Sequence, residues 1–363
     1  MHLSHLSLKN FRSYSELELP LNPGITIFLG RNGEGKTNIV ESILYLAFLS
    51  SHRTSGDLPL VKLGESAAYT RAKIQHPERE ILVELEINGE RANRARINQN
   101  PIRSQKELFG LIQCIYFSPE DMDLVRGDPS ERRRFIDQIL TLRSPRLAGV
   151  ISDYERAVRQ RNALLKTRAN SAALEPWDQQ VAKYGAEIIA ARTTLLEEFN
   201  PFFTKVYSNI SPEKPAHIKY KSSIENPSTS PEENFQIIIQ KMGEIRSQEI
   251  DRGLTLVGPH RDDLLLHLGD HLVKGYASHG ESWSIALSLK LAAYQLLLHE
   301  GTKPILILDD VFSELDEERR EQLISLAKSA EQTFITVAVE GDLPKDLQGT
   351  TYIVKNGSVK LKP

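Results

Sequence analysis

The chain has almost none of the residues that build disulfides and zinc sites. Its 363 residues contain one cysteine, Cys114, which excludes an intramolecular disulfide and a zinc site made of several cysteines. Because Leu111, Ile112 and Ile115 flank it in the sequence, we expect Cys114 to be a buried structural thiol. Long hydrophobic runs are missing as well. No stretch approaches the roughly eighteen apolar residues of a membrane span, which excludes a membrane-embedded protein.

The N-terminus carries no secretory signal, and the overall charge is nearly balanced. Residues 1–8 alternate polar and apolar side chains like a strand, without the charged start, apolar run and small-residue cleavage site of a signal peptide. We therefore expect a cytoplasmic protein. The formal net charge of −3 disfavours a protein that is basic over its whole surface, but it leaves a local basic patch open.

Two kinds of hydrophobic spacing point to two lobes. Short strand-like segments dominate the first part of the chain and return near its end, whereas helical spacing begins at Pro129. The sequence therefore predicts an α/β fold, a mixed sheet with helices, in which one discontinuous domain comprises residues 1–125 and 246–363. Residues 126–245 form an inserted helical lobe in this prediction.

A glycine-rich segment between an expected strand and an expected helix predicts a phosphate-binding loop. The pattern G-x-x-x-x-G-K-[ST] supplies backbone N–H groups that curl around phosphates, a lysine for the β and γ oxygens, and a hydroxyl for Mg²⁺. A plain glycine-rich turn is the structural alternative, but the apolar strand 25–29 before the segment favours ATP binding. The loop residues are Gly30, Arg31, Asn32, Gly33, Glu34, Gly35, Lys36 and Thr37.

Two carboxylates at the end of an apolar strand are the second part of the expected site. Asp309 and Asp310 follow the run 304–308. In P-loop ATPases such acids hold Mg²⁺ and orient the attacking water. We therefore assign Asp309, together with Thr37, to the metal, and Asp310, together with Lys36, to catalysis. Taken alone, two acids after a strand could equally cap a helix.

A serine and a glycine ahead of a long expected helix precede these acids. Ser278 and Gly280 lie where the hydroxyl and a backbone N–H at a helix N-terminus make an anion receptor. Such a segment is usually only a cap. In this order, however, it resembles the signature of ABC-type ATPases, in which a second copy brings these residues to the γ-phosphate. The resemblance implies an ATP-dependent homodimer.

Several further segments match one branch of that class. They are 8–14, 51–54, 117–121, 127–129 with Arg132, Arg133 and 135–137, and 258–263. Together they resemble the RecF family of bacterial recombination-repair ATPases, relatives of the SMC-type chromosome ATPases, over most of the chain. The resemblance implies an ABC-type P-loop ATPase head with ATP and Mg²⁺ as cofactors and weak, DNA-stimulated hydrolysis. It also implies DNA that is gapped or has single-strand/double-strand junctions, RecR and RecO as partners, RecA loading, a role in the SOS response, and nucleoid association.

Three features depart from the wider class. Residues 282–284 read Ser-Trp-Ser where a polar run is expected, so signature contacts beyond Ser278 and Gly280 stay unassigned. No histidine follows the strand 333–337, where transporter-type ABC proteins carry their γ-phosphate switch, and a residue near Thr336 is the candidate substitute. The third departure is the Q-loop, which has no obvious match in the sequence, and Glu120 is the candidate for its position.

Arginines in two regions are open to two interpretations. Arg12 and Arg53 are either solvated surface residues or contacts to the nucleotide, and we take Arg12 as a candidate contact. Between residues 126 and 168, eleven basic and five acidic residues give a local net charge of +6. A solvated helix face is the usual fate of such a run, and DNA phosphate contact is the alternative. The candidate DNA-binding residues are Arg132, Arg133, Arg156, Arg159 and Arg161, with the hairpin 91–103 as the next region to consider.

Two other function classes share part of this pattern. The ATPase subunit of a transporter would carry the phosphate loop, but the long helical insertion and the missing switch histidine count against it. A small-molecule kinase shares the phosphate loop and has no reason to carry the segment around Ser278. We expect an ATP-gated DNA-repair protein.

Overall fold

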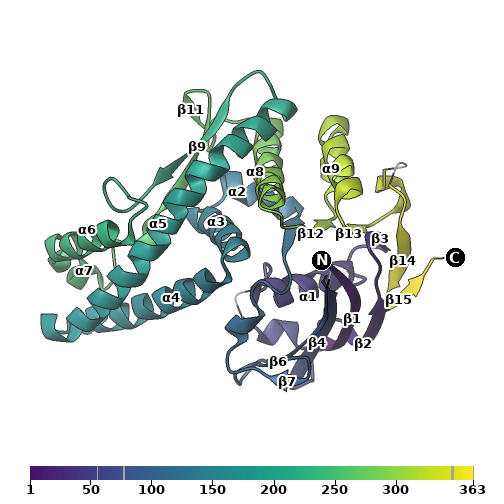
Figure 1. Cartoon of the computed structure of the whole chain (residues 1–363), viewed down its shortest axis with the longest axis horizontal. Coiled ribbons are helices and arrows are strands. Elements are labelled where there is room, and N and C mark those ends of the chain that lie inside the picture. Colours follow the sequence, from purple (N-terminus) through teal and green to yellow (C-terminus); the bar gives the residue numbers. More distant parts are fainter. Residues whose placement is uncertain (55, 77, 345–346, 363) are drawn as a thin grey trace. The chain divides into compact units, whose positions relative to one another are not determined.

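Contacts within the chain divide it into two units. The structure is a computed structural model that describes residues 1–54, 56–76, 78–344 and 347–362. The first unit comprises Met1–Asp121 and Tyr294–Pro363, and the second comprises Met122–Ala293 (Figure 1). No described helix is both long and apolar enough to cross a membrane.

An antiparallel sheet opens the first unit, with the strand order β2-β1-β4-β5-β6-β7. In β5, every second residue from Ile81 to Ile87 is buried, as a period of two requires when one face of a sheet covers the core. The strands are β1 (His2–Phe11), β2 (Tyr14–Pro20), β4 (Ala67–Gln75), β5 (Glu80–Asn88), β6 (Arg94–Ile97) and β7 (Asn100–Pro101).

The second sheet of this unit is parallel except for its terminal hairpin, with the order β15-β14-β3-β13-β12-β8. Because the carboxyl ends of β3, β12 and β13 meet at one edge, the segments that follow these strands lie together there. The strands are β3 (Gly24–Leu29), β8 (Cys114–Phe117), β12 (Ile305–Asp309), β13 (Gln332–Val337), β14 (Thr350–Lys355) and β15 (Ser358–Leu361); the helices are α1 (Lys36–Phe48) and α9 (Glu317–Ser329).

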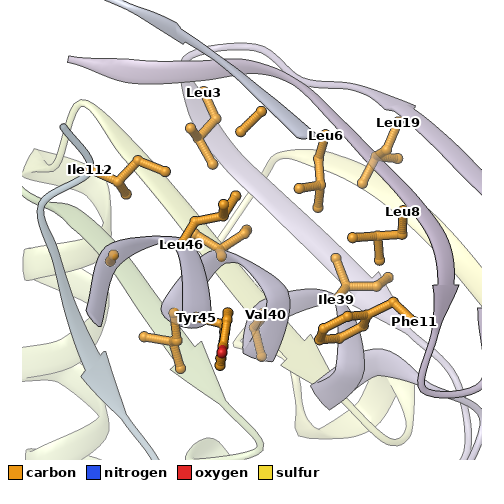
Figure 2. Close-up of a cluster of buried hydrophobic side chains, with 14 of the residues drawn as sticks. Leu3, Leu6, Leu8, Phe11, Leu19, Ile39, Val40, Tyr45, Leu46 and Ile112 are labelled. Atoms are coloured by element: carbon orange, nitrogen blue, oxygen red, sulfur yellow. The ribbon is translucent and has the colours of Figure 1, made fainter. Parts of the chain in front are cut away.

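The core of the first unit lies between the antiparallel sheet and helix α1. Figure 2 shows Leu6 and Leu8 of β1 on the sheet side of this cluster and Ile39 and Val40 of α1 on the helix side. The cluster fixes α1, and thereby the phosphate loop at its N-terminus, to the sheet. The expected buried thiol is confirmed, since Cys114 on β8 belongs to this core.

The second unit combines helices with a small antiparallel sheet of order β11-β10-β9. Figure 1 shows α5, in teal, as its longest element, and α4 and α6 pack against it. The elements are α2 (Asp123–Arg126), α3 (Pro129–Arg143), α4 (Pro145–Lys166), α5 (Ser171–Ile210), β9 (Ala216–Lys221), α6 (Pro231–Glu244), α7 (Arg246–Arg252), β10 (Asp263–Leu268) and β11 (His271–Leu272). Helix α8 (His279–His299) begins in the second unit and belongs to the first from Tyr294 onward. Short 3₁₀ turns of the first unit cover Leu58–Leu60, Gln105–Leu108, Phe312–Glu314 and Glu340–Asp342. Pro119–Met122 crosses the boundary between the units, and Pro259–Arg261 lies in the second.

The second unit extends beyond the insertion that the sequence suggested. The expected lobe ended at residue 245, whereas the compact unit continues to Ala293. Strand pairing explains the difference, because β10 pairs with β9 along its whole length, from Asp263 opposite Lys221 to Leu268 opposite Ala216. Strand β10 therefore belongs to the second unit, and the chain returns to the first unit only from Tyr294 onward.

Candidate nucleotide-binding site

The phosphate loop is held in shape by the turn between β1 and β2. Gly35 has a φ of 110°, a conformation that favours glycine, and it stands directly before α1. A Cβ at this position would lie 2.9 Å from the Tyr14 hydroxyl and 3.0 Å from Ser13 Oγ. The Tyr14 hydroxyl donates to the Gly35 carbonyl at 3.1 Å. Both the backbone angle and the lack of space therefore require glycine here.

A second turn closes on the same loop from the C-terminal hairpin. A Cβ at Gly30 would lie 2.2 Å from the backbone oxygen of Val354 in β14. The Glu34 carboxylate accepts from the N–H of Asn356, in the turn that joins β14 to β15. The loop is thus packed from two sides, while Arg31, Asn32 and Gly33 at its tip are exposed.

Lys36 is buried at the start of α1 and points its amine across the loop. The side chain is 3% exposed. Nζ lies 3.4 Å from Asn32 Oδ1, 3.5 Å from the Arg31 carbonyl and 3.6 Å from Asp310 Oδ2. An amine held over exposed loop N–H groups at a helix N-terminus is suited to bind phosphate oxygens.

Asp309 receives hydrogen bonds on both of its carboxylate oxygens. Thr37 Oγ1 donates to Oδ1 at 3.3 Å, and Thr336 Oγ1 of β13 donates to Oδ1 at 2.5 Å. The Tyr116 hydroxyl of β8 donates to Oδ2 at 3.1 Å. Burial raises the pKa of Asp309 from its ordinary 3.8 to about 6, the hydrogen bond from Thr336 opposes this, and the neighbouring charge of Asp310 adds to it.

A hydroxyl and a carboxylate side by side fit a magnesium ion. Thr37 and Asp309 offer oxygen donors, which Mg²⁺ prefers, and leave other coordination positions for water and nucleotide oxygens. Among the described residues, no group of three or more His, Cys, Asp or Glu side chains could hold a metal.

Asp310 stands where the strand ends and the chain turns away. Its φ is 49°, in the left-handed region, and its N–H donates to Thr336 Oγ1 at 3.0 Å. The side chain is 31% exposed and lines an open hollow of about 210 Å³ with Asn32, Phe312 and Ser313 among its walls. A carboxylate at the wall of a hollow next to the phosphate loop can orient a water molecule.

Ser278 and Gly280 stand at the start of α8 and belong to the second unit. The N–H of Ser278 donates to Glu281 Oε2 at 2.8 Å, and the N–H of Glu281 donates to Ser278 Oγ at 3.2 Å. These reciprocal bonds and the ion pair with Lys214 lower the pKa of Glu281 to about 2. The exposed Ser278 side chain also hydrogen-bonds to Glu281 and adds to this lowering.

Arg12 lies beside the loop but is tied to α1. Its Nε and Nη2 donate to the two oxygens of Glu41 at 2.8 and 2.5 Å, and Arg53 Nη1 lies 3.4 Å from Oε2. Burial opposes the charge of Glu41, but the bonds from Arg12 and Ser51 outweigh it and lower its pKa. Arg12, Ser13, Asn38 and Arg53 line a second open hollow of about 660 Å³. The ion pair with Glu41 thus holds Arg12 at the wall of a hollow that is large enough for a base or a ribose.

Three contacts of this site were not foreseen in the sequence: Tyr116, His52 and Glu41. Tyr116 stands 193 positions from the carboxylate that it contacts, and only strand pairing brings the two together. Thr336 was suspected only as a switch residue. It contacts Asp309 and Asp310, and its role as a switch stays a prediction, as does that of the exposed Glu120 in the Q-loop.

The candidate DNA surface needs correction at two positions. Arg161 is fully buried and donates to Asp178 at 2.7 Å and to Glu249 at 2.5 Å. Arg132 is 5% exposed and binds Asp263 at 2.7 and 3.1 Å. Both guanidinium groups neutralise carboxylates inside the second unit, so they offer nothing to a DNA phosphate.

The other three candidates differ in exposure. Arg133 is half-buried and donates to the Asp262 carbonyl at 2.8 Å. Arg156 and Arg159 are each 69% exposed, with Asp153 at 3.4 Å and Glu155 at 3.8 Å. Only these last two present their charge to solvent.

The comparisons with known proteins agree with this geometry. A profile described as the RecF/RecN/SMC N terminal domain matches residues 2–358. The chain is 49% identical to the DNA replication and repair protein RecF of Streptomyces avermitilis, over 99% of this chain and 100% of that protein. It is 46% identical to the DNA replication and repair protein RecF of Frankia alni, over 99% of each chain.

Solved structures give the same result for the fold. A structure of the recombination mediator protein RecF-ATPrS in the RecFOR pathway superposes with a TM-score of 0.91 at 27% identity, covering 99% of this chain and 98% of that one. An Smc head bound to the C-winged helix domain of ScpA superposes with a TM-score of 0.59 at 16% identity, covering 100% and 97%, and shares the fold.

Fold and site together define an ATPase head of the ABC and SMC class, with a phosphate loop after β3 and an acidic end to β12. The chain belongs to the RecF/RecN/SMC family, and within it to the RecF proteins.

Proposed function

We propose that the chain binds and hydrolyses ATP with Mg²⁺ as a molecular switch in DNA replication and repair. The observation that carries this proposal is the convergence of Lys36, Thr37, Asp309 and Asp310 at one sheet edge. Solved structures described as RecF-ATPrS and RecF-ATP, which superpose on nearly the whole chain, support ATP as the nucleotide.

Each of these four side chains has its own role in ATP hydrolysis. Lys36 binds the β- and γ-phosphate oxygens, and Thr37 and Asp309 hold Mg²⁺. Bound Mg²⁺ would neutralise phosphate charge. Asp310 orients a water for in-line attack on the γ-phosphorus, with ADP as the leaving group. Because Asp310 is one methylene shorter than glutamate, we expect slow turnover. Stimulation of this turnover by DNA is proposed from the resemblance to RecF proteins.

We infer that one copy of the chain supplies only part of the γ-phosphate cage. The phosphate loop belongs to the first unit, while Ser278 and Gly280 belong to the second. In our proposal a second copy places its Ser278 hydroxyl and Gly280 N–H on the γ-phosphate, so that ATP holds a head-to-tail homodimer together.

DNA is the proposed partner, at gaps and single-strand/double-strand junctions. The names of the relatives support a role in DNA replication and repair, and the RecFOR pathway named for the solved structure supports RecO and RecR as partners. Assistance in RecA loading is part of the same proposal. Induction of the SOS response and a cytoplasmic, nucleoid-associated location belong to the same proposal. Phosphate contacts from the exposed Arg156 and Arg159 would provide affinity without reading sequence.

A gel-shift series tests this function. Gapped, blunt and single-stranded DNA are each titrated with no nucleotide, with ADP and with ATP, in parallel with Lys36→Ala. We expect ATP-dependent retention of gapped DNA that Lys36→Ala abolishes. Retention that is the same with and without ATP would contradict the proposed gating.

A further inference from the structure

A tyrosine hydroxyl lies between the carboxylate proposed to bind the metal and a histidine that had no assigned role. Tyr116 of β8 is paired in register with Ile307 of β12, so its side chain projects from the same sheet face as Asp309, two residues further along. The hydroxyl donates to Asp309 Oδ2 at 3.1 Å and lies 3.1 Å from His52 Nε2. The His52 and Tyr116 rings are 4.7 Å apart, so the two residues also pack on one another.

The two oxygens of Asp309 have different donors. Thr37 and Thr336 both donate to Oδ1, and Tyr116 donates to Oδ2. Donors on both oxygens fix the plane of the carboxylate as well as its position. Removing the Tyr116 donor would leave Oδ2 free to rotate away while Oδ1 stays bound to the threonines.

The tautomer of His52 affects the hydrogen bond from Tyr116 to Asp309. A phenol has one proton. When Tyr116 donates it to Asp309, the contact with His52 is a hydrogen bond if His52 Nε2 carries a hydrogen and donates it to the phenol oxygen. With the hydrogen on Nδ1 instead, Nε2 and Asp309 Oδ2 would compete for the single phenol proton. His52 lies in the segment 51–54, which follows α1 in the chain. Its neighbour Arg53 lines the hollow of about 660 Å³.

We propose that Tyr116 and His52 are positioning residues for the Mg²⁺ held by Thr37 and Asp309, an inference that rests on the ATP site proposed above. Hydrogen-bond partners of a ligating carboxylate set its orientation, and their loss typically lowers metal affinity or activity by about tenfold or more. The effect is expected on the metal and on the metal-dependent step, since neither residue lines the phosphate loop.

The chain offers a matched control for the tyrosine. Tyr45 is buried in the same unit, and its hydroxyl donates to Asp57 Oδ1 at 2.7 Å. Tyr45→Phe and Tyr116→Phe therefore each remove one hydroxyl that donates to a carboxylate, but only the second carboxylate is a proposed metal ligand. For His52, glutamine places an amide nitrogen near the position of Nε2, whereas leucine removes the donor.

The experiment measures Mn²⁺ binding to the full chain by electron paramagnetic resonance, with a non-hydrolysable ATP analogue present. For Tyr116→Phe and His52→Leu we expect the Kd of Mn²⁺ to rise about tenfold. His52→Gln and Tyr45→Phe should keep the wild-type Kd. Analogue binding without metal should be equal in all variants. In turnover assays, Tyr116→Phe should need more Mg²⁺ for half-maximal rate.

Two results would overturn the inference, and they are distinguishable. If wild type binds Mn²⁺ with the analogue and Tyr116→Phe and His52→Leu bind it equally well, the positioning role is wrong and the ATP site stands. If wild type binds neither analogue nor Mn²⁺, the proposed ATP site fails and the inference fails with it. Thermal melts of each variant exclude misfolding as the cause, and the His52 pair tests the same chain of bonds should Tyr116→Phe not fold.

Discussion

Replacing Arg161 with methionine should destabilise the second unit and leave any DNA surface intact. Arg161 is fully buried, and its guanidinium contacts Asp178, Glu249 and Thr255 at 2.7, 2.5 and 3.0 Å. Burial opposes its charge, but the bonds to Glu249 and Asp178 outweigh this and raise its pKa. The substitution therefore removes the positive partner from two buried carboxylates.

The magnitude follows from what each carboxylate keeps. Asp178 retains Arg246 at 2.6 Å, and Glu249 retains the N–H of Leu256 at 2.7 Å but no longer has Arg161 as its counter-charge. Breaking a buried pair by removing one partner costs about 3 to 5 kcal/mol. Because Asp178 keeps a partner, we expect about 3 kcal/mol, which lowers the Tm of a unit of this size by roughly 6 to 12 °C.

Differential scanning calorimetry measures the loss, with Arg159→Met as the matched control. Arg159 lies on the same helix, is 69% exposed, and its contact to Glu155 is 3.8 Å long. Exposed pairs of this kind contribute at most about 1 kcal/mol, so the control should melt close to wild type. If Arg161→Met melts like wild type and instead loses DNA affinity, the assignment of Arg161 to the core is wrong.

Three further outcomes are expected. Asp310→Asn should slow ATP hydrolysis, measured by phosphate release, and prolong the dimer. Turnover at the wild-type rate would show that this carboxylate has another role. Lys36→Ala should abolish nucleotide binding, measured by equilibrium titration. The double change Arg156→Glu with Arg159→Glu should weaken DNA binding and flatten its salt dependence by about one unit for each lost phosphate contact, and unchanged binding at every salt concentration would move the search to the hairpin 91–103. Since burial raises the pKa of Asp309 to about 6 and Mg²⁺ needs the ionised carboxylate, calorimetric Mg²⁺ affinity with bound nucleotide should fall about tenfold per pH unit below that value and be flat above it; a flat profile down to pH 5 would contradict this.

The site's main chemistry could be predicted because it depends on local sequence. The residue pattern from Gly30 to Thr37 predicts a phosphate loop without reference to other segments, and the alternation in strands such as β5 follows from a period of two. Asp309 and Asp310 could be assigned to the site because two acids after an apolar strand are typical of P-loop ATPases. These inferences need no knowledge of which distant segments pair.

The contacts that were missed all join residues far apart in the chain. Arg132 meets Asp263 131 positions later, and Arg161 meets Glu249 88 positions later. Counting charge within one window gave +6 for residues 126–168, but the acids that neutralise it come from α5, α7 and β10. A window of sequence cannot show which arginines are internal counter-charges.

The extent of the second unit shows the same limit. Strand β10 pairs with β9, which lies within the expected insertion 126–245. Because the sequence does not show this pairing, the predicted boundary fell at residue 245, whereas the second unit continues to Ala293.

Sedimentation of the full chain with Mg²⁺ and either ATP or ADP tests the central claim most directly. The account predicts a dimer with ATP at micromolar protein, a monomer with ADP, and a monomer for Ser278→Arg even though that variant still binds ATP. An equal mass with ATP, with ADP and without nucleotide would contradict the claim that a second copy completes the site.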